Sequence, residues 1–174
     1  WKKEKLKNVL KISNERNKNN LFSKNDVISV SREAGTVNQI EYQGRSFAGN
    51  DISNYKVIKP GDLIYTKSPL KDAPYGIFQE ATIIGIVSPL YAVYKSTDRV
   101  FAPFVAMLLK NDSNSTQYLS PLVSKGAKNT INISDAGALD GNLFFQKLKN
   151  KRNFIYSIQK LIKQLSFIKR NLIT

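Results

Sequence analysis

The chain has 174 residues, which is enough for one domain or for one domain with an extension. It contains no cysteine, which excludes disulfides and thiol chemistry, and no histidine, which removes the commonest general base and the commonest metal ligand. Its 27 Lys and Arg residues against 13 Asp and Glu residues give a formal net charge of +14, which suits a polyanionic partner such as nucleic acid. The alternative is a basic protein that has no such partner.

The residues that most enzyme mechanisms need are also missing. Without histidine, a Ser-His-Asp or Cys-His site is impossible, and a zinc site of the usual ligands is nearly so. The sequence has no glycine-rich phosphate loop in the dinucleotide or Walker spacing, and no Asn-Pro-Pro-aromatic motif of amino-methyltransferases. The nearest approach to a magnesium-binding carboxylate cluster is Asp62, Asp72 and Glu80, of which we interpret Asp62 as a turn residue and Asp72 as part of a polar loop. We therefore expect no catalytic residue, no metal site and no cofactor, and we expect that the chain is not an enzyme.

The first 53 residues predict short elements followed by a long polar connection. Lys2–Ile12 has one apolar face among lysines, which predicts an opening strand or short helix, and alternation over Asp26–Ser31 predicts a strand. Arg32–Ser53 is polar and contains three glycines, with a short strand expected over Val37–Tyr42, and a connection this long is either functional or disordered. Its Arg and Gln side chains are of the types that read base edges, although they could equally be solvated loop residues. The candidate DNA-binding residues here are Arg32, Gln43 and Arg45.

Tyr55–Tyr94 predicts the run of short strands around which the chain is organised. Within it, Lys59-Pro60-Gly61-Asp62 predicts a type II turn, because proline presets φ at the first central position and glycine accepts a positive φ at the second. Ala81–Val87 is a nearly continuous apolar run that predicts a buried strand. Lys67–Ile77 is either a second DNA-binding loop, whose lysines meet phosphates and whose tyrosine packs on a sugar or base, or an ordinary turn between strands. Its candidate DNA-binding residues are Lys67, Lys71 and Tyr75.

Two helices and a third basic loop are predicted next. Phe101–Leu109 predicts a helix with Pro103 in its first turn, where no backbone N–H is missed, and with an apolar face directed to the core. A shorter helix is expected over Ser113–Leu119. Leu122–Ser134 is a basic, glycine-bearing loop in which lysines and backbone N–H groups could hold phosphate. Its candidate DNA-binding residues are Lys125, Lys128 and Asn129.

The C-terminal residues carry the most regular pattern in the chain. Asp140-Gly141-Asn142 offers an N-cap, and a helix is predicted over about Leu143–Leu172. Its apolar residues recur at seven-residue spacing, which predicts a coiled-coil seam that needs a partner helix. The alternative is a single helix folded back across its own domain. The predicted coiled-coil interface residues are Leu148, Ile155, Ile158, Ile162, Leu165 and Leu172.

Three segments, taken in order, share a pattern with a known protein family. They are Tyr55–Tyr65 (YKVIKPGDLIY), Gly85–Tyr94 (GIVSPLYAVY), and Gly126–Asn129 (GAKN) followed by Ile131–Ser134 (INIS). Together with the predicted helix that follows them, they resemble a target recognition domain of the specificity subunits of type I restriction-modification systems. The resemblance covers nearly the whole chain.

The resemblance implies sequence-specific recognition of duplex DNA, by half of a specificity subunit that directs modification and restriction subunits to a bipartite target. In that family two recognition domains are separated by long helices that pack as an antiparallel coiled coil. The modification (methyltransferase) subunits bring S-adenosylmethionine, the restriction subunits join afterwards, and the specificity subunit catalyses nothing. This chain has one recognition domain and one helix, so it is either half of a cut or split protein or a half-subunit that pairs with a copy of itself.

We therefore expect an α+β fold with two parts: a mixed or antiparallel, β-rich target recognition domain with short helices over residues 1–140, and a long C-terminal coiled-coil helix over residues 141–174. The expected partners are double-stranded DNA, the modification subunits, the restriction subunit indirectly, and a homodimer partner or second recognition half through the C-terminal helix. The absence of a signal peptide and of a membrane-spanning apolar run leads us to expect a cytoplasmic location and no membrane partner. Two other functions stay open: a protein-interaction module that competes for methyltransferase subunits, and the recognition fragment of a fused restriction nuclease-methyltransferase.

Overall fold

The computed structural model describes residues 2–126 and 130–145. Contacts within the chain divide it into two units, one formed by Glu4–Leu143 and the other by Trp1–Lys3 together with Phe144–Thr174. The described residues of all three predicted loops belong to Glu4–Leu143, so their positions relative to one another can be compared directly.

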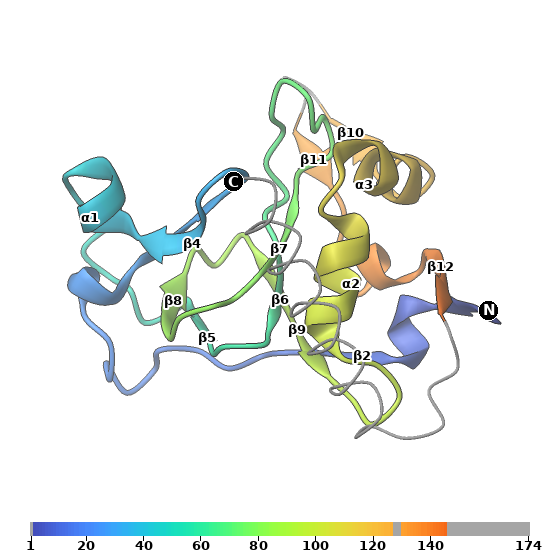
Figure 1. Ribbon diagram of the computed structural model, residues 1–174. Coiled ribbons are helices and arrows are strands. Elements are labelled where there is room, and N and C mark those ends of the chain that lie inside the picture. Colours follow the sequence, from blue (N-terminus) through green and yellow to red (C-terminus); the bar gives the residue numbers. More distant parts are fainter. Residues whose placement is uncertain (1, 127–129, 146–174) are drawn as a thin grey trace, which may run out of the picture. The chain divides into compact units, whose positions relative to one another are not determined.

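Short strands dominate the described residues, and the helices between them are brief (Figure 1). The strands are β1 (Lys2–Lys5), β2 (Leu10–Ile12), β3 (Ile28–Ser31), β4 (Gly35–Asn38), β5 (Lys56–Ile58), β6 (Leu63–Tyr65), β7 (Phe78–Glu80), β8 (Gly85–Val87), β9 (Ala92–Ser96), β10 (Ser124–Lys125), β11 (Ile131–Asn132) and β12 (Asn142–Phe145). The α-helices are α1 (Gln39–Gln43), α2 (Ala102–Leu109) and α3 (Asp112–Leu119), and the 3-10 turns are η1 (Leu6–Asn8), η2 (Lys24–Asp26) and η4 (Gly137–Leu139).

The largest sheet has four strands in the order β2-β9-β6-β7, and each neighbouring pair is antiparallel. Leu63 of β6 lies opposite Tyr94 of β9 on one side and opposite Glu80 of β7 on the other. Because β9 lies between β2 and β6, pairings between residues far apart in the sequence assemble this sheet. The remaining strands form two-stranded sheets: β1 with β12, β3 with β4, β5 with β8, and β10 with β11.

Two apolar clusters hold these strands in place. One contains Ile28, Ile58, Ile64, Ala81, Val87 and Val93, and the other contains Val27, Ile52, Val57 and Ile86. Helix α2 contacts β6, β7 and β9 and buries Ala102, Val105, Ala106 and Leu109. Full burial of one Val, Ile or Leu side chain stabilises a fold by about 1.5–3 kcal/mol, so these clusters give the loops between the strands a rigid base.

Local structure agrees with the sequence at the central turn and at α2, and differs from it at two strands. The N–H of Asp62 donates to the carbonyl of Lys59 at 3.0 Å and Gly61 has a φ of 91°, which confirms the type II turn. The strand predicted over Ala81–Val87 is confirmed only for Gly85–Val87, the buried strand β8, because residues 82–84 form an exposed connection between β7 and β8. The predicted strand over Val37–Tyr42 ends at Asn38, whose side chain caps α1.

The predicted fold class is wrong. Instead of an α+β fold with a mixed or antiparallel domain and a long C-terminal coiled-coil helix, the structure consists mainly of small antiparallel sheets with three short helices, none longer than eight residues within 2–126 and 130–145. The predicted helix start is instead strand β12 (Asn142–Phe145), in which two aromatic residues favour an extended backbone and β1 supplies the pairing strand. Gly141 does not cap a helix, and its carbonyl accepts from the N–H of Leu6 at 3.1 Å.

The rest of the predicted helix lies outside the described residues. This includes all of the predicted coiled-coil interface: Leu148, Ile155, Ile158, Ile162, Leu165 and Leu172. Among the helices that the structure does describe, none has both the length and the apolar character needed to cross a membrane.

Candidate nucleic-acid interface

Three segments that carry predicted DNA-binding residues meet in the structure. The residues are Arg32 in the turn between β3 and β4, Lys67, Lys71 and Tyr75 in the connection between β6 and β7, and Lys125 in β10. Arg32 Nη1 lies 3.7 Å from Asp72 Oδ2 in that connection, and Lys125 Nζ lies 5.0 Å from the ring centroid of Tyr75. Because the two outer segments both contact the β6–β7 connection, we refer to the three segments together as the loop cluster.

Arg32 is held both at its backbone and at its guanidinium. Its Nη2 lies 3.0 Å from Asp112 Oδ2 at the start of α3, in addition to the contact of Nη1 with Asp72. The side-chain amide of Gln79 in β7 donates to the carbonyls of Ser31 at 2.9 Å and of Arg32 at 3.1 Å. Gln79 is 7% exposed, so a buried amide uses both of its N–H groups to fix this turn.

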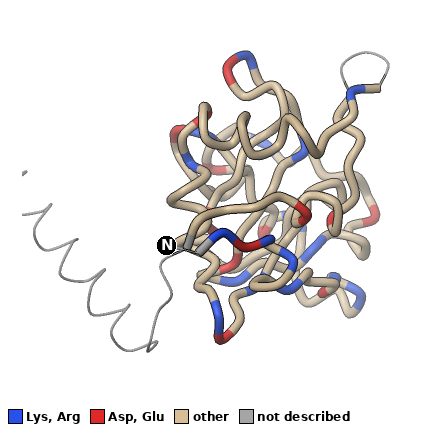
Figure 2. The backbone as a smooth tube through the Cα atoms, turned by 90° about the vertical axis from the view of Figure 1, so that its right-hand side faces the viewer, with Lys and Arg blue, Asp and Glu red and all other residues tan. Residues whose placement is uncertain are grey.

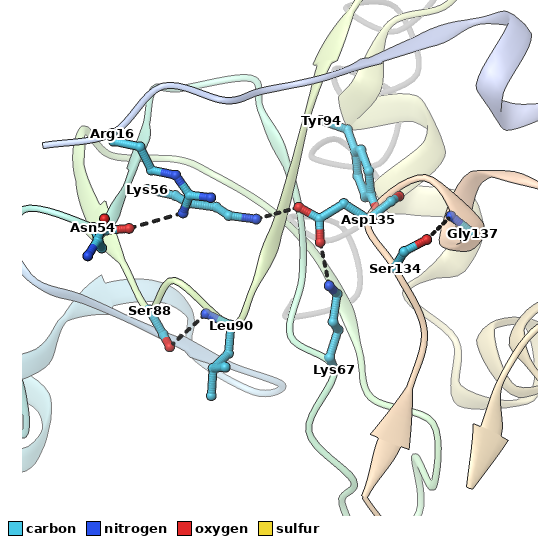
Figure 3. A network of polar contacts seen from close by, with 10 residues as sticks. All are labelled: Arg16, Asn54, Lys56, Lys67, Ser88, Leu90, Tyr94, Ser134, Asp135 and Gly137. Carbon is cyan, nitrogen blue, oxygen red and sulfur yellow. Dashed lines mark hydrogen bonds and ion pairs between the residues drawn. The ribbon is translucent and has the colours of Figure 1, made fainter. Parts of the chain in front are cut away.

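Asp135 anchors the start of the β6–β7 connection. Figure 3 shows the ammonium groups of Lys56 and Lys67 directed at the two carboxylate oxygens of Asp135, one at each oxygen. The hydroxyl of Tyr94 donates to the main-chain carbonyl of Asp135 at 2.9 Å. Lys67 also has a φ of 52°, which is uncommon for a residue with a side chain. The ammonium of Lys67 is therefore already paired with a carboxylate, and its side chain is only 16% exposed, so Lys67 is less available to a phosphate than an exposed lysine.

Burial and pairing act in opposite directions on the Lys56–Asp135 pair. The side chain of Lys56 is 3% exposed, and burial lowers its pKa although the hydrogen bond and charge of Asp135 act to raise it. Burial alone would raise the pKa of Asp135, but hydrogen bonds from Lys56 and Lys67 outweigh that effect and lower this pKa below its ordinary value. Asp135 is therefore ionised at neutral pH and can anchor both lysines.

The β6–β7 connection is also tied together at its base. The hydroxyl of Tyr65 donates to the main-chain carbonyl of Tyr75 at 2.6 Å. Gly76 has a φ of 87°, and a Cβ atom there would lie 3.1 Å from the backbone nitrogen of Lys67. The two ends of the connection thus pack backbone against backbone, which only glycine allows at this position. Tyr75 is therefore presented from a fixed base.

Gln43 and Arg45 lie apart from Arg32. Gln43 ends α1, and the guanidinium carbon of Arg45 lies 4.7 Å from the ring centroid of Phe47. Helix α1 follows β4 directly, at the end of the β3–β4 hairpin opposite the Arg32 turn, because Asn38 pairs with Ile28. In Figure 1, α1 lies at the left, whereas β10 and α3 lie at the upper right.

The structure thus brings together five of the predicted DNA-binding residues and leaves two on a separate projection. The five are Arg32, Lys67, Lys71, Tyr75 and Lys125, and the two are Gln43 and Arg45. The predicted residues Lys128 and Asn129 lie outside the described residues.

Sequence reasoning missed the side chains that hold these cations in place. Asp112, Asp135 and Gln79 belong to no local motif, and Asp72 is interpreted from sequence only as a polar loop residue. Asp135 is 79 residues from Lys56 and 68 residues from Lys67, so no spacing pattern could pair them. The available signal for Asp135 is its position directly after the third basic loop.

Charge is less one-sided in the described residues than in the whole chain. Eighteen of the 27 Lys and Arg residues and all 13 Asp and Glu residues fall within 2–126 and 130–145, which gives these ranges a formal charge of +5. Figure 2 shows Lys and Arg interspersed with Asp and Glu along the described backbone.

In the loop cluster, Lys71 and Lys125 are exposed, and neither has a carboxylate partner among the described residues. These two cations are the ones best placed to meet an anionic ligand.

No group of three His, Cys, Asp or Glu side chains within residues 2–126 and 130–145 is placed to hold a metal ion. No protein-family model matches the chain, and no curated protein sequence matches it either.

Proposed function

We propose that this chain recognises duplex DNA in a sequence-specific manner, as one recognition unit of a type I restriction-modification specificity subunit. The observation that carries the proposal is the loop cluster, in which exposed lysines, an aromatic ring and a fixed arginine converge from three separate segments. Proteins position themselves on phosphates with such lysines and read bases with such arginines. The resemblance of Tyr55–Tyr65 and Gly85–Tyr94 to target recognition domains supports the same function.

The structure suggests different roles for the residues of the loop cluster. Lys71 and Lys125 are exposed and would contact phosphates, which positions the protein without reading the sequence. Tyr75 lies under the ammonium of Lys125 and would pack against a sugar or base. Lys67 is engaged by Asp135 and would act mainly by shaping the connection. Arg32, which Asp112 and Gln79 hold in place, would be the residue of the cluster that reads a base.

In this proposal the chain selects the DNA site and other subunits act on it. The modification subunits would methylate the target with S-adenosylmethionine that they bring themselves, and the restriction subunit would be recruited through them. The chain would need no metal, cofactor or catalytic residue of its own. These partners follow from the resemblance and belong to the proposal.

The test is selection of binding sites from a randomised duplex library by the full chain, without metal and near physiological salt. We expect one short motif, or a spaced pair of motifs, to be enriched. A failure to enrich any motif, with or without an added modification subunit, would contradict the proposal. Tight binding to that subunit in the same experiment would favour the protein-interaction module instead.

Lysine variants test whether the loop cluster is the surface that binds DNA. Lys71→Ala and Lys125→Ala should each weaken binding to all duplexes alike, and each should reduce the slope of log affinity against log salt by about one. Lys18→Ala is the matched control, because Lys18 is an exposed lysine outside the loop cluster. Equal effects of all three substitutions would mean that DNA binding is not localised to the cluster.

A further inference from the structure

Arg32 pairs with two carboxylates, not one. Asp112 lies 3.0 Å and Asp72 lies 3.7 Å from its guanidinium nitrogens. One arginine with two aspartates carries a formal charge of −1, in a chain whose total is +14. A phosphate at Arg32 would meet the two carboxylates that flank this guanidinium, whereas Lys71 and Lys125 are exposed and have no such flanking pair, so Arg32 is less suited than these lysines to contact the DNA backbone. The uncharged edges of the bases are the part of a duplex that it can contact.

The arrangement presents hydrogen-bond donors and acceptors side by side. A guanidinium has five N–H donors, and the contact with Asp112 is made through Nη2. The distance of 3.7 Å between Nη1 and Asp72 Oδ2 is too long for a hydrogen bond, so this contact leaves the donor and the acceptor able to bond to a ligand. The side chain of Asp72 is 63% exposed and that of Arg32 is 32% exposed. A ligand can therefore approach an N–H edge of Arg32 and an oxygen of Asp72 at the same time.

The major-groove edge of a G·C pair is complementary to this arrangement. Guanine offers two acceptors, N7 and O6, and cytosine offers the N4 amino donor. The O6 and N4 atoms are hydrogen-bonded to each other and therefore about 2.9 Å apart. The Arg32 donor and the Asp72 acceptor are 3.7 Å apart, a spacing that lets one side chain face each base of the pair. An A·T pair would instead set the adenine N6 donor against the arginine and the thymine O4 acceptor against the carboxylate.

We propose that Arg32 and Asp72 together read one G·C base pair in the major groove, with Arg32 on guanine and Asp72 on cytosine. The inference rests on the proposed function and adds to it the identity of one base pair and a residue that sequence reasoning did not select. Asp112 and Gln79 serve as positioning residues, since Asp112 orients the guanidinium and Gln79 fixes the backbone of the turn. Such support lowers the ordering cost of binding and keeps the donor directions fixed.

The experiment compares the sites that the full chain and its variants select from a randomised duplex library. Asp72→Asn replaces the carboxylate at an exposed position, so folding should be retained, and thermal unfolding checks this. We expect the wild-type motif to contain a G·C pair whose preference over A·T falls by about 5- to 150-fold in Asp72→Asn, with the other positions unchanged. Glu33→Gln is the matched control, because it removes one negative charge from the same turn and should leave the motif intact.

A modified base tests the role of Arg32 without altering the protein. Substituting 7-deazaguanine at the assigned position removes the N7 acceptor, and this should weaken wild-type binding. The same substitution should have much less effect in Arg32→Lys, because a lysine lacks the fork that contacts N7 and O6 together. A role limited to folding would not produce this dependence on one atom of the DNA.

The outcomes separate this inference from the proposed function. If the wild-type chain selects a motif in which no G·C preference depends on Asp72, the inference is wrong and DNA recognition stands. If Glu33→Gln relaxes the same position equally, the effect is one of net charge and the inference is wrong. If the wild-type chain selects no motif under any condition, both the proposed function and this inference fail.

Discussion

Replacing Asp135 by Asn should lower the free energy of unfolding by about 2–3 kcal/mol. The carboxylate of Asp135 receives the ammonium of Lys56, whose side chain is 3% exposed, and that of Lys67. The other charged groups that act on Lys56 are Arg16 and Lys67, which are also cations, so the substitution leaves a buried ammonium among positive charges. Breaking a buried ion pair costs about 3–5 kcal/mol, and we place the estimate lower because Asp135 is 25% exposed and water screens part of the effect.

A double-mutant cycle with Lys56→Met isolates this interaction. Lys56→Met leaves Asp135 paired with Lys67, and a methionine of similar length can fill the buried space without carrying a charge. The double variant Lys56→Met/Asp135→Asn should therefore be more stable than the sum of the single effects predicts, by about 1 kcal/mol or more. Stability is measured by urea unfolding followed by far-ultraviolet circular dichroism.

The pH dependence of the same variants supplies a second measurement. Pairing lowers the pKa of Asp135 in the folded state, so its stabilisation is fully present above the ordinary value of 3.8 and is lost as the pH falls through the folded value. The wild-type chain and Asp135→Asn should thus differ by a constant amount between pH 7 and about pH 5, and they should converge in stronger acid. A difference under about 0.5 kcal/mol at pH 7, or strictly additive effects in the cycle, would show that this ion pair does not anchor the β6–β7 connection.

Two further substitutions test packing and capping. Gly141→Ala should destabilise the fold by about 1–3 kcal/mol, because a Cβ atom there would lie 2.3 Å from Cε2 of the buried Tyr118. Gly49→Ala, which meets nothing within 4 Å, is its control in the same urea unfolding measurement, and equal stability of the two variants would contradict the packing at Tyr118. Asn38→Ala should cost about 1 kcal/mol and speed amide hydrogen exchange in α1, because the Asn38 side chain accepts from two N–H groups in the first turn of that helix. Unchanged exchange in α1 would mean that this cap does not stabilise the helix.

Much of the local structure could be predicted because it depends on neighbours in the sequence. Pro60 and Gly61 set the backbone angles of their turn wherever the turn lies in the fold. Pro103 fits the first turn of a helix but not its interior, so it indicates where α2 begins. The residue types in the three polar connections were enough to select Arg32, Tyr75 and Lys125 as candidate contacts. They could not show which of these segments meet, because that depends on how the strands pair.

The sequence by itself therefore determined the turn at Lys59–Asp62 and the position of α2, both of which are set by the conformational preferences of adjacent residues. Only the tertiary structure decided which charges are paired, since Lys56 and Asp135 meet across 79 residues of chain. It also decided that Asn142–Phe145 is a strand, because β1 offers its backbone groups a pairing partner there. A backbone segment adopts whichever conformation satisfies its hydrogen bonds and buries its apolar side chains, and the partners that make this possible are distant in the sequence.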